Sequence, residues 1–202
     1  DACKKLGINS VPLNILPVSG SNMDKHISDG RIKLISFTGS GDVGWGIKKK
    51  TDRQKVSLEL GGNAGVIVNN DADIDSAAAK ITIGGFSQAG QSCISVQRVY
   101  VHKDIYDTFR GKIVESAKNI KYGDPYNENT ITGPMITEDE AIRAENWVNE
   151  AKNAGAKILC GGKRSGAVLE PTVIENAPDT ANVKCAEVFA PVITIEAVNS
   201  IE

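Results

Sequence analysis

The sequence predicts an α/β protein with mainly parallel sheets, and three observations favour this fold class. Short apolar runs alternate with helix-like segments, which is the rhythm of strand–helix–strand units. A glycine-rich turn at residues 39–44 follows one of these runs and opens a helix. The pair Gly61-Gly62 allows a sharp change of direction between two packed units. We therefore expect two domains, residues 1–60 and residues 61–202.

The first domain is expected to hold three strands and two helices. Short apolar runs predict the strands, and polar segments between them predict the helices. The strands are expected at residues 11–18, 32–37 and 56–60, and the helices at residues 22–28 and 40–50. The second helix ends in three lysines, residues 48–50, whose charges suit the negative end of a helix dipole.

The second domain repeats this alternation with longer elements. Strands are expected at residues 65–68, 96–101, 158–160, 172–174 and 192–197, and helices at residues 73–86, 104–119 and 137–154. Thr137 is followed three residues later by Glu140, which predicts a capping box at the start of the last helix. Gly155 is expected to end that helix.

Composition excludes several classes of function. The 202 residues are 41% hydrophobic and 24% charged, an ordinary globular balance. The net charge is -2 without a basic stripe, so no nucleic-acid partner is expected. The apolar runs are too short to span a bilayer, and without a visible signal peptide we expect a cytoplasmic protein. Because the chain begins at Asp1 in helix-like sequence, we expect a fragment or a processed product.

No metal site is expected. The four cysteines contain no CxxC pair, so a zinc ribbon is unsupported and reduced thiols are the default. A segment beginning at Asp71 starts like a calcium loop, but Ser76 stands where such a loop needs glycine. Helix capping explains these acidic residues better.

The glycine-rich turn is a candidate phosphate site. Gly39, Gly41 and Gly44 satisfy the pattern G-x-G-x-x-G between a strand and a helix. Free backbone N–H groups at the start of that helix could receive a pyrophosphate. An ordinary glycine-rich turn remains the alternative.

Two roles compete for Glu59. It lies 20 residues after Gly39, the place of the acid that holds a ribose in dinucleotide-binding folds. It also stands between Leu58 and Leu60, and apolar neighbours disfavour a charged carboxylate, which makes it a candidate general base. The local residues do not decide between the two roles.

Two further segments carry candidate chemistry. Cys93 stands among small residues between an expected helix and an expected strand, and a nucleophilic cysteine needs access and a stabilised thiolate. An inert thiol is the alternative. Glu187 and Phe189 lie two apart, so on an extended segment they would point to the same side and could hold a ribose and brace a planar ring. A half-buried entry into a strand is the alternative there.

Taken together, these motifs resemble the aldehyde dehydrogenase superfamily in their order and spacing. The matching segments are Phe37-Thr38-Gly39-Ser40, Leu58-Glu59-Leu60-Gly61-Gly62, Gly90-Gln91-Ser92-Cys93 and Glu187-Val188-Phe189-Ala190-Pro191-Val192. The resemblance covers nearly the whole chain and implies the family's parallel-sheet sandwich, incomplete at both ends. Residues 1–60 match the C-terminal part of a Rossmann-like NAD(P)-binding domain, and residues 61–202 match the cysteine-bearing catalytic domain.

The resemblance also implies a role for each candidate residue. Cys93 matches the family's nucleophile and Glu59 its general base. Ser40 matches a pyrophosphate contact, Glu187 the acid on the nicotinamide ribose, and Phe189 the ring beside the nicotinamide. The positions implied to contact NAD or NADP are Gly39, Ser40, Gly44, Leu60, Gly61, Glu187 and Phe189.

The sequence departs from the family at several places. Ala186 stands where the family often has a second acid, and Ala190 and Val18 stand where it usually has glycine. The family's upstream asparagine, part of the oxyanion hole, and the lysine that grips the adenosine ribose have no counterpart here. We therefore expect these 202 residues alone to be inactive or nearly so.

The implied reaction is oxidation of an aldehyde to a carboxylic acid with NAD or NADP, through a thiohemiacetal and a thioester on Cys93. The family forms dimers and tetramers, so a homo-oligomer is expected for the full-length protein. Three alternatives remain open. They are an acyl-coenzyme A-forming or semialdehyde dehydrogenase of the same superfamily, a non-catalytic scaffold, and a plain Rossmann reductase without a covalent step.

Overall fold

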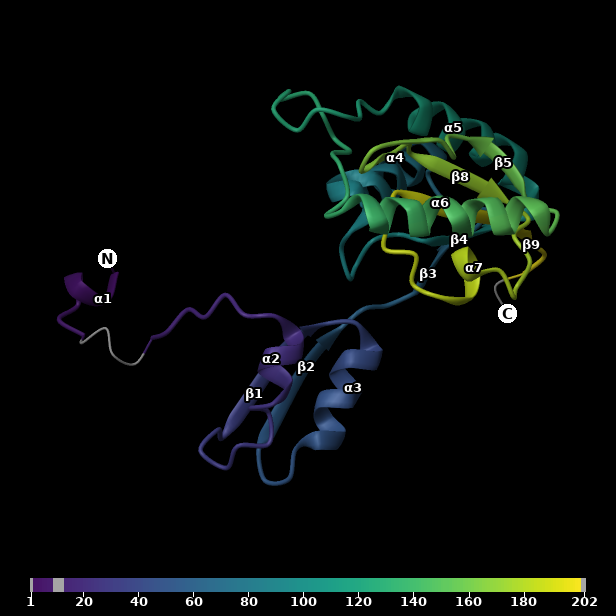
Figure 1. Ribbon diagram of the computed structural model, residues 1–202. Helices are drawn as coiled ribbons and strands as arrows, with labels where there is room; N and C mark the ends of the chain where they lie inside the picture. The colour runs from purple at the N-terminus through teal and green to yellow at the C-terminus, as the bar shows by residue number, and fades with distance from the viewer. Residues whose placement is uncertain (1, 9–12, 201–202) are drawn as a thin grey trace. The chain divides into compact units, whose positions relative to one another are not determined.

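The computed structural model describes residues 2–8 and 13–200. The chain divides into two compact units, Asp1–Leu60 and Gly61–Glu202 (Figure 1). The division falls at the glycine pair that the sequence singled out. Whether the two units are a cofactor-binding part and a catalytic part remains a prediction.

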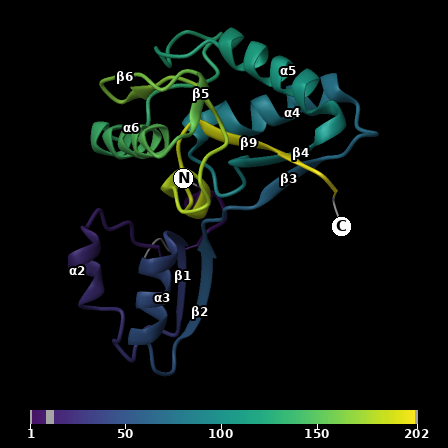
Figure 2. The same ribbon diagram turned by 90° about the vertical axis from the view of Figure 1, so that its right-hand side faces the viewer.

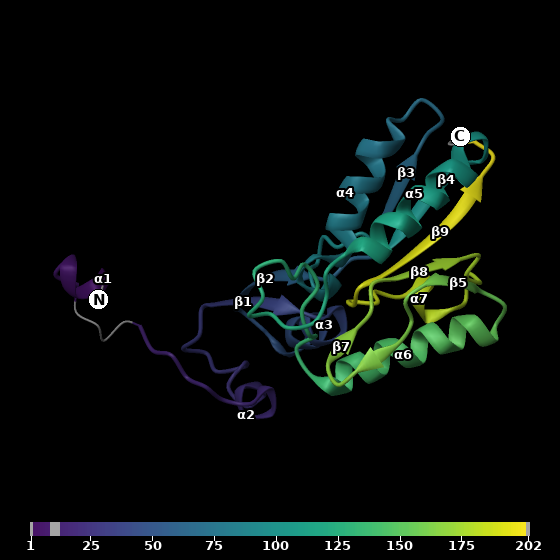
Figure 3. The ribbon, with the colours of Figure 1, turned by 90° about the horizontal axis from the view of Figure 1, so that it is seen from above.

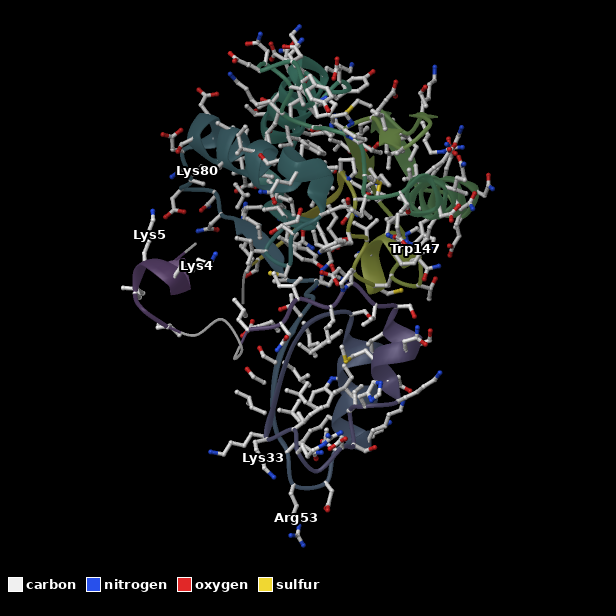
Figure 4. The ribbon with its side chains drawn as sticks, turned by 60° about the vertical axis from the view of Figure 1, so that its left-hand side comes forward. Lys4, Lys5, Lys33, Arg53, Lys80 and Trp147 are labelled. Carbon is white, nitrogen blue, oxygen red and sulfur yellow. The ribbon has the colours of Figure 1, made fainter. Side chains whose placement is uncertain are left out.

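The first unit holds two parallel strands joined through a helix. Its elements are α1 (Ala2–Lys5), α2 (Gly20–Asp24), β1 (Leu34–Gly39), α3 (Gly41–Lys50) and β2 (Lys55–Leu60). β1 and β2 pair in parallel register from Leu34 opposite Lys55 to Gly39 opposite Leu60. In Figure 4 the exposed side chains of Lys33 and Arg53 mark the end of the unit where β1 and β2 begin.

One expected strand of this unit is wrong. Residues 13–18 form no strand, and residues 11 and 12 lie outside the described part of the chain. Ile15 is 86% exposed, and Pro17 has no N–H to give to a ladder. Apolar composition alone does not make a strand without a partner to pair with. The expected helix at residues 22–28 is instead the shorter α2, capped by Ser19, whose hydroxyl accepts from the Asn22 N–H.

The second unit is built on a five-stranded sheet in the order β3-β4-β9-β8-β5. The strands are β3 (Gly65–Val68), β4 (Arg98–His102), β5 (Lys157–Cys160), β8 (Thr172–Glu175) and β9 (Val192–Val198). Every neighbouring pair is parallel except β5 with β8, which is antiparallel. A small hairpin, β6 (Arg164–Ser165) and β7 (Val168–Leu169), lies outside this sheet.

Helices cover both faces of the sheet (Figures 2 and 3). α4 (Ile74–Phe86) and α5 (Tyr106–Asn119) lie side by side on one face, while α6 (Glu138–Asn153) and the short α7 (Asn182–Cys185) lie on the other. Two separate apolar clusters fill the two interfaces. Neighbouring residues of β8 divide between them, because Val173 faces α4 and α5 while Ile174 faces α6.

The expected helix caps form, with one difference. Asp73 accepts a hydrogen bond from the Ser76 N–H at 3.1 Å and caps α4. Thr137 accepts from the Glu140 N–H at 3.2 Å and caps α6. The Glu140 carboxylate does not complete the predicted capping box but accepts from Arg143 Nε at 2.8 Å. Across the described residues, no helix has the length and apolarity needed to cross a membrane.

Candidate functional site

Three loops of the second unit meet at one edge of the sheet. Gly61-Gly62 precede β3, Cys93 precedes β4, and the segment 187–189 precedes β9. These three strands are neighbours and run parallel, so the loops before them lie at the same edge. The topology thus brings together residues that are as far apart in sequence as Gly61 and Phe189.

Cys93 lies in a tight turn on the surface of this unit. The turn is closed by a hydrogen bond of 2.9 Å from the Ser95 N–H to the Ser92 carbonyl, and Cys93 is exposed. Exposure alone does not single it out, because Cys185 is exposed as well. Cys160 is half-buried, and burial raises the pKa of its thiol and so disfavours a thiolate there.

The chain enters the Cys93 turn through a left-handed segment. Gln88, Ala89 and Gly90 have φ values of 53°, 55° and 66°, a conformation that only glycine adopts without cost. A Cβ at Gly90 would overlap the Ala190 carbonyl, so this glycine permits close approach of the loop before β4 to the loop before β9. The Gln91 side chain fixes the other side of the loop by accepting a hydrogen bond of 2.8 Å from the Ile136 N–H.

The Glu187 carboxylate packs against the backbone of Gly61 and Gly62. Its Oε1 accepts a hydrogen bond of 3.0 Å from the Gly62 N–H. A Cβ at Gly61 would overlap the Glu187 carboxylate, so only glycine leaves that carboxylate its place. A Cβ at Gly62 would lie 3.5 Å from the Cys93 carbonyl oxygen, which places the Cys93 turn beside the same pair.

The expected geometry of Glu187 and Phe189 is wrong. Phe189 has a φ of 47°, so the backbone is not extended there, and the extended segment that would put both side chains on the same side does not form. The bend follows from the residue between them. The Val188 N–H donates to Gln97 Oε1 at 2.6 Å, and the Val188 carbonyl accepts from Arg143 Nη2 at 2.8 Å. With both backbone groups and the buried valine side chain held, the chain turns at the next residue.

Sequence reasoning missed Gln97 and Arg143. Gln97 is 1% exposed and also donates to the Gly62 carbonyl at 2.8 Å. Arg143 stacks over the ring of Trp147, labelled in Figure 4, at 4.6 Å from its centroid. The available signal was Gln97 within the expected strand 96–101, because an amide buried in a sheet needs hydrogen-bond partners.

The first unit holds the remaining candidate residues. Ser40 is the exposed N-cap of α3, and its hydroxyl makes no capping hydrogen bond to that helix. A Cβ at Gly39 would overlap the Phe37 ring, and one at Gly44 would overlap a methyl group of Leu60. Gly44 therefore allows the close packing of α3 on β1 and β2, as the third glycine of a dinucleotide fingerprint does, while Gly39 leaves room for the Phe37 ring.

The expected apolar surroundings of Glu59 are wrong. Leu58 and Leu60 point toward Gly44 on α3, whereas Glu59 alternates to the opposite face of β2 and is exposed. The side chains of Leu58 and Leu60 therefore do not surround the Glu59 carboxylate. The role of Glu59 as a general base stays a prediction that rests on the resemblance.

Each unit, taken by itself, carries groups that suit part of a dinucleotide cofactor. A Cβ at Gly41, the first residue of α3, would meet nothing within 4 Å, so the helix N-terminus is open to an anion. Glu187 is half-buried and keeps acceptor capacity beyond the Gly62 N–H. In the described part of the chain, no group of three or more His, Cys, Asp or Glu side chains could hold a metal ion.

Comparison with known proteins identifies the family. The sequence model described as "Aldehyde dehydrogenase family" matches residues 1–202, and the chain belongs to this family. The 3-sulfolactaldehyde dehydrogenase of Priestia aryabhattai is 42% identical over 200 residues, which are 98% of this chain and 42% of that protein. The chain thus spans about two fifths of the length of this relative.

Solved structures show the same fold. Aldehyde dehydrogenase 21 from Physcomitrella patens, in complex with the reaction product succinate, matches with a TM-score of 0.88 and 45% identity over 92% of this chain and 39% of its own. Glyceraldehyde-3-phosphate dehydrogenase GapN from Methanocaldococcus jannaschii, complexed with NADP, matches with a TM-score of 0.93 and 39% identity over 98% of this chain and 44% of its own. The predicted aldehyde dehydrogenase fold is therefore confirmed.

Proposed function

We propose that the complete protein oxidises an aldehyde to a carboxylic acid with NAD+ or NADP+, with Cys93 as the nucleophile and Glu59 as the general base. The observation that carries the proposal is the family membership of a chain that gathers Gly61-Gly62, Cys93 and Glu187 at one sheet edge. Family membership supports the type of reaction, and the proximity of Cys93, Glu187 and Gly61-Gly62 supports this part of the second unit as its site.

The first chemical step is attack of the Cys93 thiolate on the aldehyde carbon. The product is a tetrahedral thiohemiacetal, whose oxyanion accepts a hydrogen bond from the Cys93 backbone N–H. The exposed turn gives the sulfur access to a substrate carbon. Bound NAD+ or NADP+ supplies the hydride acceptor, and loss of hydride from the carbon leaves a thioester on Cys93.

The second chemical step is hydrolysis. Glu59 takes a proton from a water molecule, which attacks the thioester carbonyl and releases the acid and the Cys93 thiolate. A base that activates water favours hydrolysis over transfer to coenzyme A. In this proposal Ser40, with Gly39 and Gly44, lies at the cofactor's phosphates, while Leu60, Gly61, Glu187 and Phe189 lie at its nicotinamide end.

The proposed substrate is a short 2-hydroxyaldehyde. The relatives include a 3-sulfolactaldehyde dehydrogenase, a lactaldehyde dehydrogenase of Methanococcus aeolicus and a D-glyceraldehyde dehydrogenase of Picrophilus torridus. The three named aldehydes share a hydroxyl beside the aldehyde carbon. We further propose a cytoplasmic homo-oligomer, dimer or tetramer, without a nucleic-acid partner, in keeping with a net charge of -2.

The experiment is a turnover assay on the complete protein with lactaldehyde, glyceraldehyde and an unsubstituted aldehyde, each with NAD+ or NADP+. Acid product should form without coenzyme A, and Cys93→Ala should abolish it. Cys185→Ala removes another exposed thiol and is the matched control, which should keep its activity. Normal turnover by Cys93→Ala would instead indicate a reductase without a covalent step. A requirement for coenzyme A would indicate the acylating alternative.

A further inference from the structure

A buried glutamine closes a ring of hydrogen bonds beneath the candidate site. Gln97 Nε2 donates to the Gly62 carbonyl at 2.8 Å, and Gln97 Oε1 accepts from the Val188 N–H at 2.6 Å. The Gly62 N–H donates in turn to Glu187, the residue covalently joined to Val188. The ring runs from Gln97 through Gly62 and Glu187 to Val188 and back to Gln97.

The ring joins the loop before β3 to the loop before β9. Gln97 itself lies after the third loop, which carries Cys93, where the chain enters β4. Gln97 lies four residues after Cys93, just before β4 begins at Arg98. Its own carbonyl accepts from the Thr194 N–H at 2.8 Å, which fixes its backbone against β9. One side chain therefore sets the spacing between the loop before β3 and the loop before β9.

Burial makes this arrangement rigid. Gln97 is 1% exposed and Val188 is fully buried, so water cannot readily replace the bond between these two residues. A buried N–H or carbonyl without a partner costs about 1–3 kcal/mol. The arrangement in which both amide ends of Gln97 are satisfied is therefore strongly preferred over any shifted arrangement of the two loops.

We propose that Gln97 is a positioning residue that holds the Glu187 carboxylate in place for the cofactor. It acts through Gly62, whose carbonyl accepts from Gln97 and whose N–H donates to Glu187, and through the N–H of Val188, the residue that follows Glu187. This inference rests on the proposed cofactor role of Glu187. Because Gln97 is buried and acts through Gly62 and Val188, its loss should act on cofactor binding more than on capture of the aldehyde.

The test uses two substitutions in the complete protein. Gln97→Met keeps the length of the side chain and removes both hydrogen bonds, while Gln97→Glu keeps the acceptor for the Val188 N–H. The matched control is Gln54→Met, because Gln54 is also a buried glutamine whose amide donates to backbone carbonyls, those of Ile27 and Asp29. The dissociation constant of NADH or NADPH is measured by fluorescence, with the aldehyde KM and the melting temperature beside it.

Gln97→Met should raise the cofactor dissociation constant about tenfold, Gln97→Glu should raise it less, and the aldehyde KM should change less than threefold. In cofactor-free Gln97→Met protein, backbone amides at 61–63 and 186–190 should exchange hydrogen faster. Gln54→Met should lower the melting temperature without weakening the cofactor. If Gln97→Met does not fold, the test rests on Gln97→Glu, whose cofactor dissociation constant should still be higher than that of wild type.

Two outcomes would overturn the proposal in distinguishable ways. If Glu187→Ala weakens the cofactor but a folded Gln97 variant does not, Gln97 is structural only and the proposed function is untouched. If Glu187→Ala also leaves cofactor affinity unchanged, the cofactor role of Glu187 is wrong, and the inference about Gln97 falls with it.

Discussion

Replacing Gly61 by alanine should move the Glu187 carboxylate without breaking the fold. An ideal Cβ at Gly61 would lie 2.5 Å from Glu187 Oε1 and still closer to the other two carboxylate atoms, whereas ordinary contact begins at 3.4 Å. The backbone at Gly61 has no positive φ that alanine would resist. Because the carboxylate is the far end of a flexible side chain, it should swing away while the backbone stays.

The magnitude follows from that displacement. Oε2, which would lie 1.7 Å from the new Cβ, must retreat by roughly 1.7 Å to reach van der Waals distance, and a misplacement of only about 1 Å in a site can cost about 100-fold in rate. The hydrogen bond from the Gly62 N–H is lost at the same time, which costs at most about 1.5–3 kcal/mol because its acceptor is charged. We therefore expect kcat/KM for the cofactor to fall about 100-fold in a protein that still folds.

Gly62→Ala provides the steric comparison. A Cβ there would lie 3.5 Å from the Cys93 carbonyl oxygen, an ordinary contact, so the loss should stay below about fivefold. The assay is kcat/KM with varied NAD+ or NADP+, together with a melting curve for each variant. Equal losses for the two alanines, or an unchanged Gly61→Ala, would refute the reasoning that Gly61 makes room for Glu187.

Two further predictions concern stability. Gly90→Ala should destabilise the complete protein by about 2–5 kcal/mol, because the new Cβ meets the rigid Ala190 backbone at a φ of 66°, and a melting temperature equal to wild type would contradict this. Burial alone raises the pKa of Glu175, but hydrogen bonds from Arg110 and Tyr106 outweigh burial and hold that pKa below its usual value. The stability from this lowered pKa is present above the usual carboxyl range and is lost as the pH falls through the folded-state pKa. The advantage of wild type over Glu175→Gln in urea unfolding should therefore shrink below about pH 4.5, and a constant advantage would contradict it.

Much of the fold could be predicted because local signals agree with tertiary structure. β3 has the expected bounds, 65–68, because glycine precedes its apolar run and polar residues follow it. The helices α4 and α6 begin within one residue of their expected starts because Asp73 and Thr137 cap them. The expected strand at residues 11–18 does not form at residues 13–18, because a strand needs a neighbouring strand to pair with and the local sequence does not show whether one is present.

The site was less predictable for the same physical reason. The bend at Phe189 follows from bonds that Val188 makes to Gln97 and Arg143, both more than 40 residues away. The exposure of Glu59 follows from strand alternation, which sends the flanking leucines to the face covered by α3. Motif matching finds residues that carry chemistry, but it does not find the buried amide that holds them in position.

The most direct test of the central claim is the first turnover of the complete protein, followed by stopped-flow measurement of NADH or NADPH formation. Wild type, Cys93→Ala and Glu59→Gln are compared with an excess of aldehyde. Cys93→Ala should form no reduced cofactor, and Glu59→Gln should give a single burst followed by a stall, because the thioester forms but is not hydrolysed. Steady turnover by Glu59→Gln at the wild-type rate would remove Glu59 as the base. Normal turnover by Cys93→Ala would contradict the covalent mechanism itself.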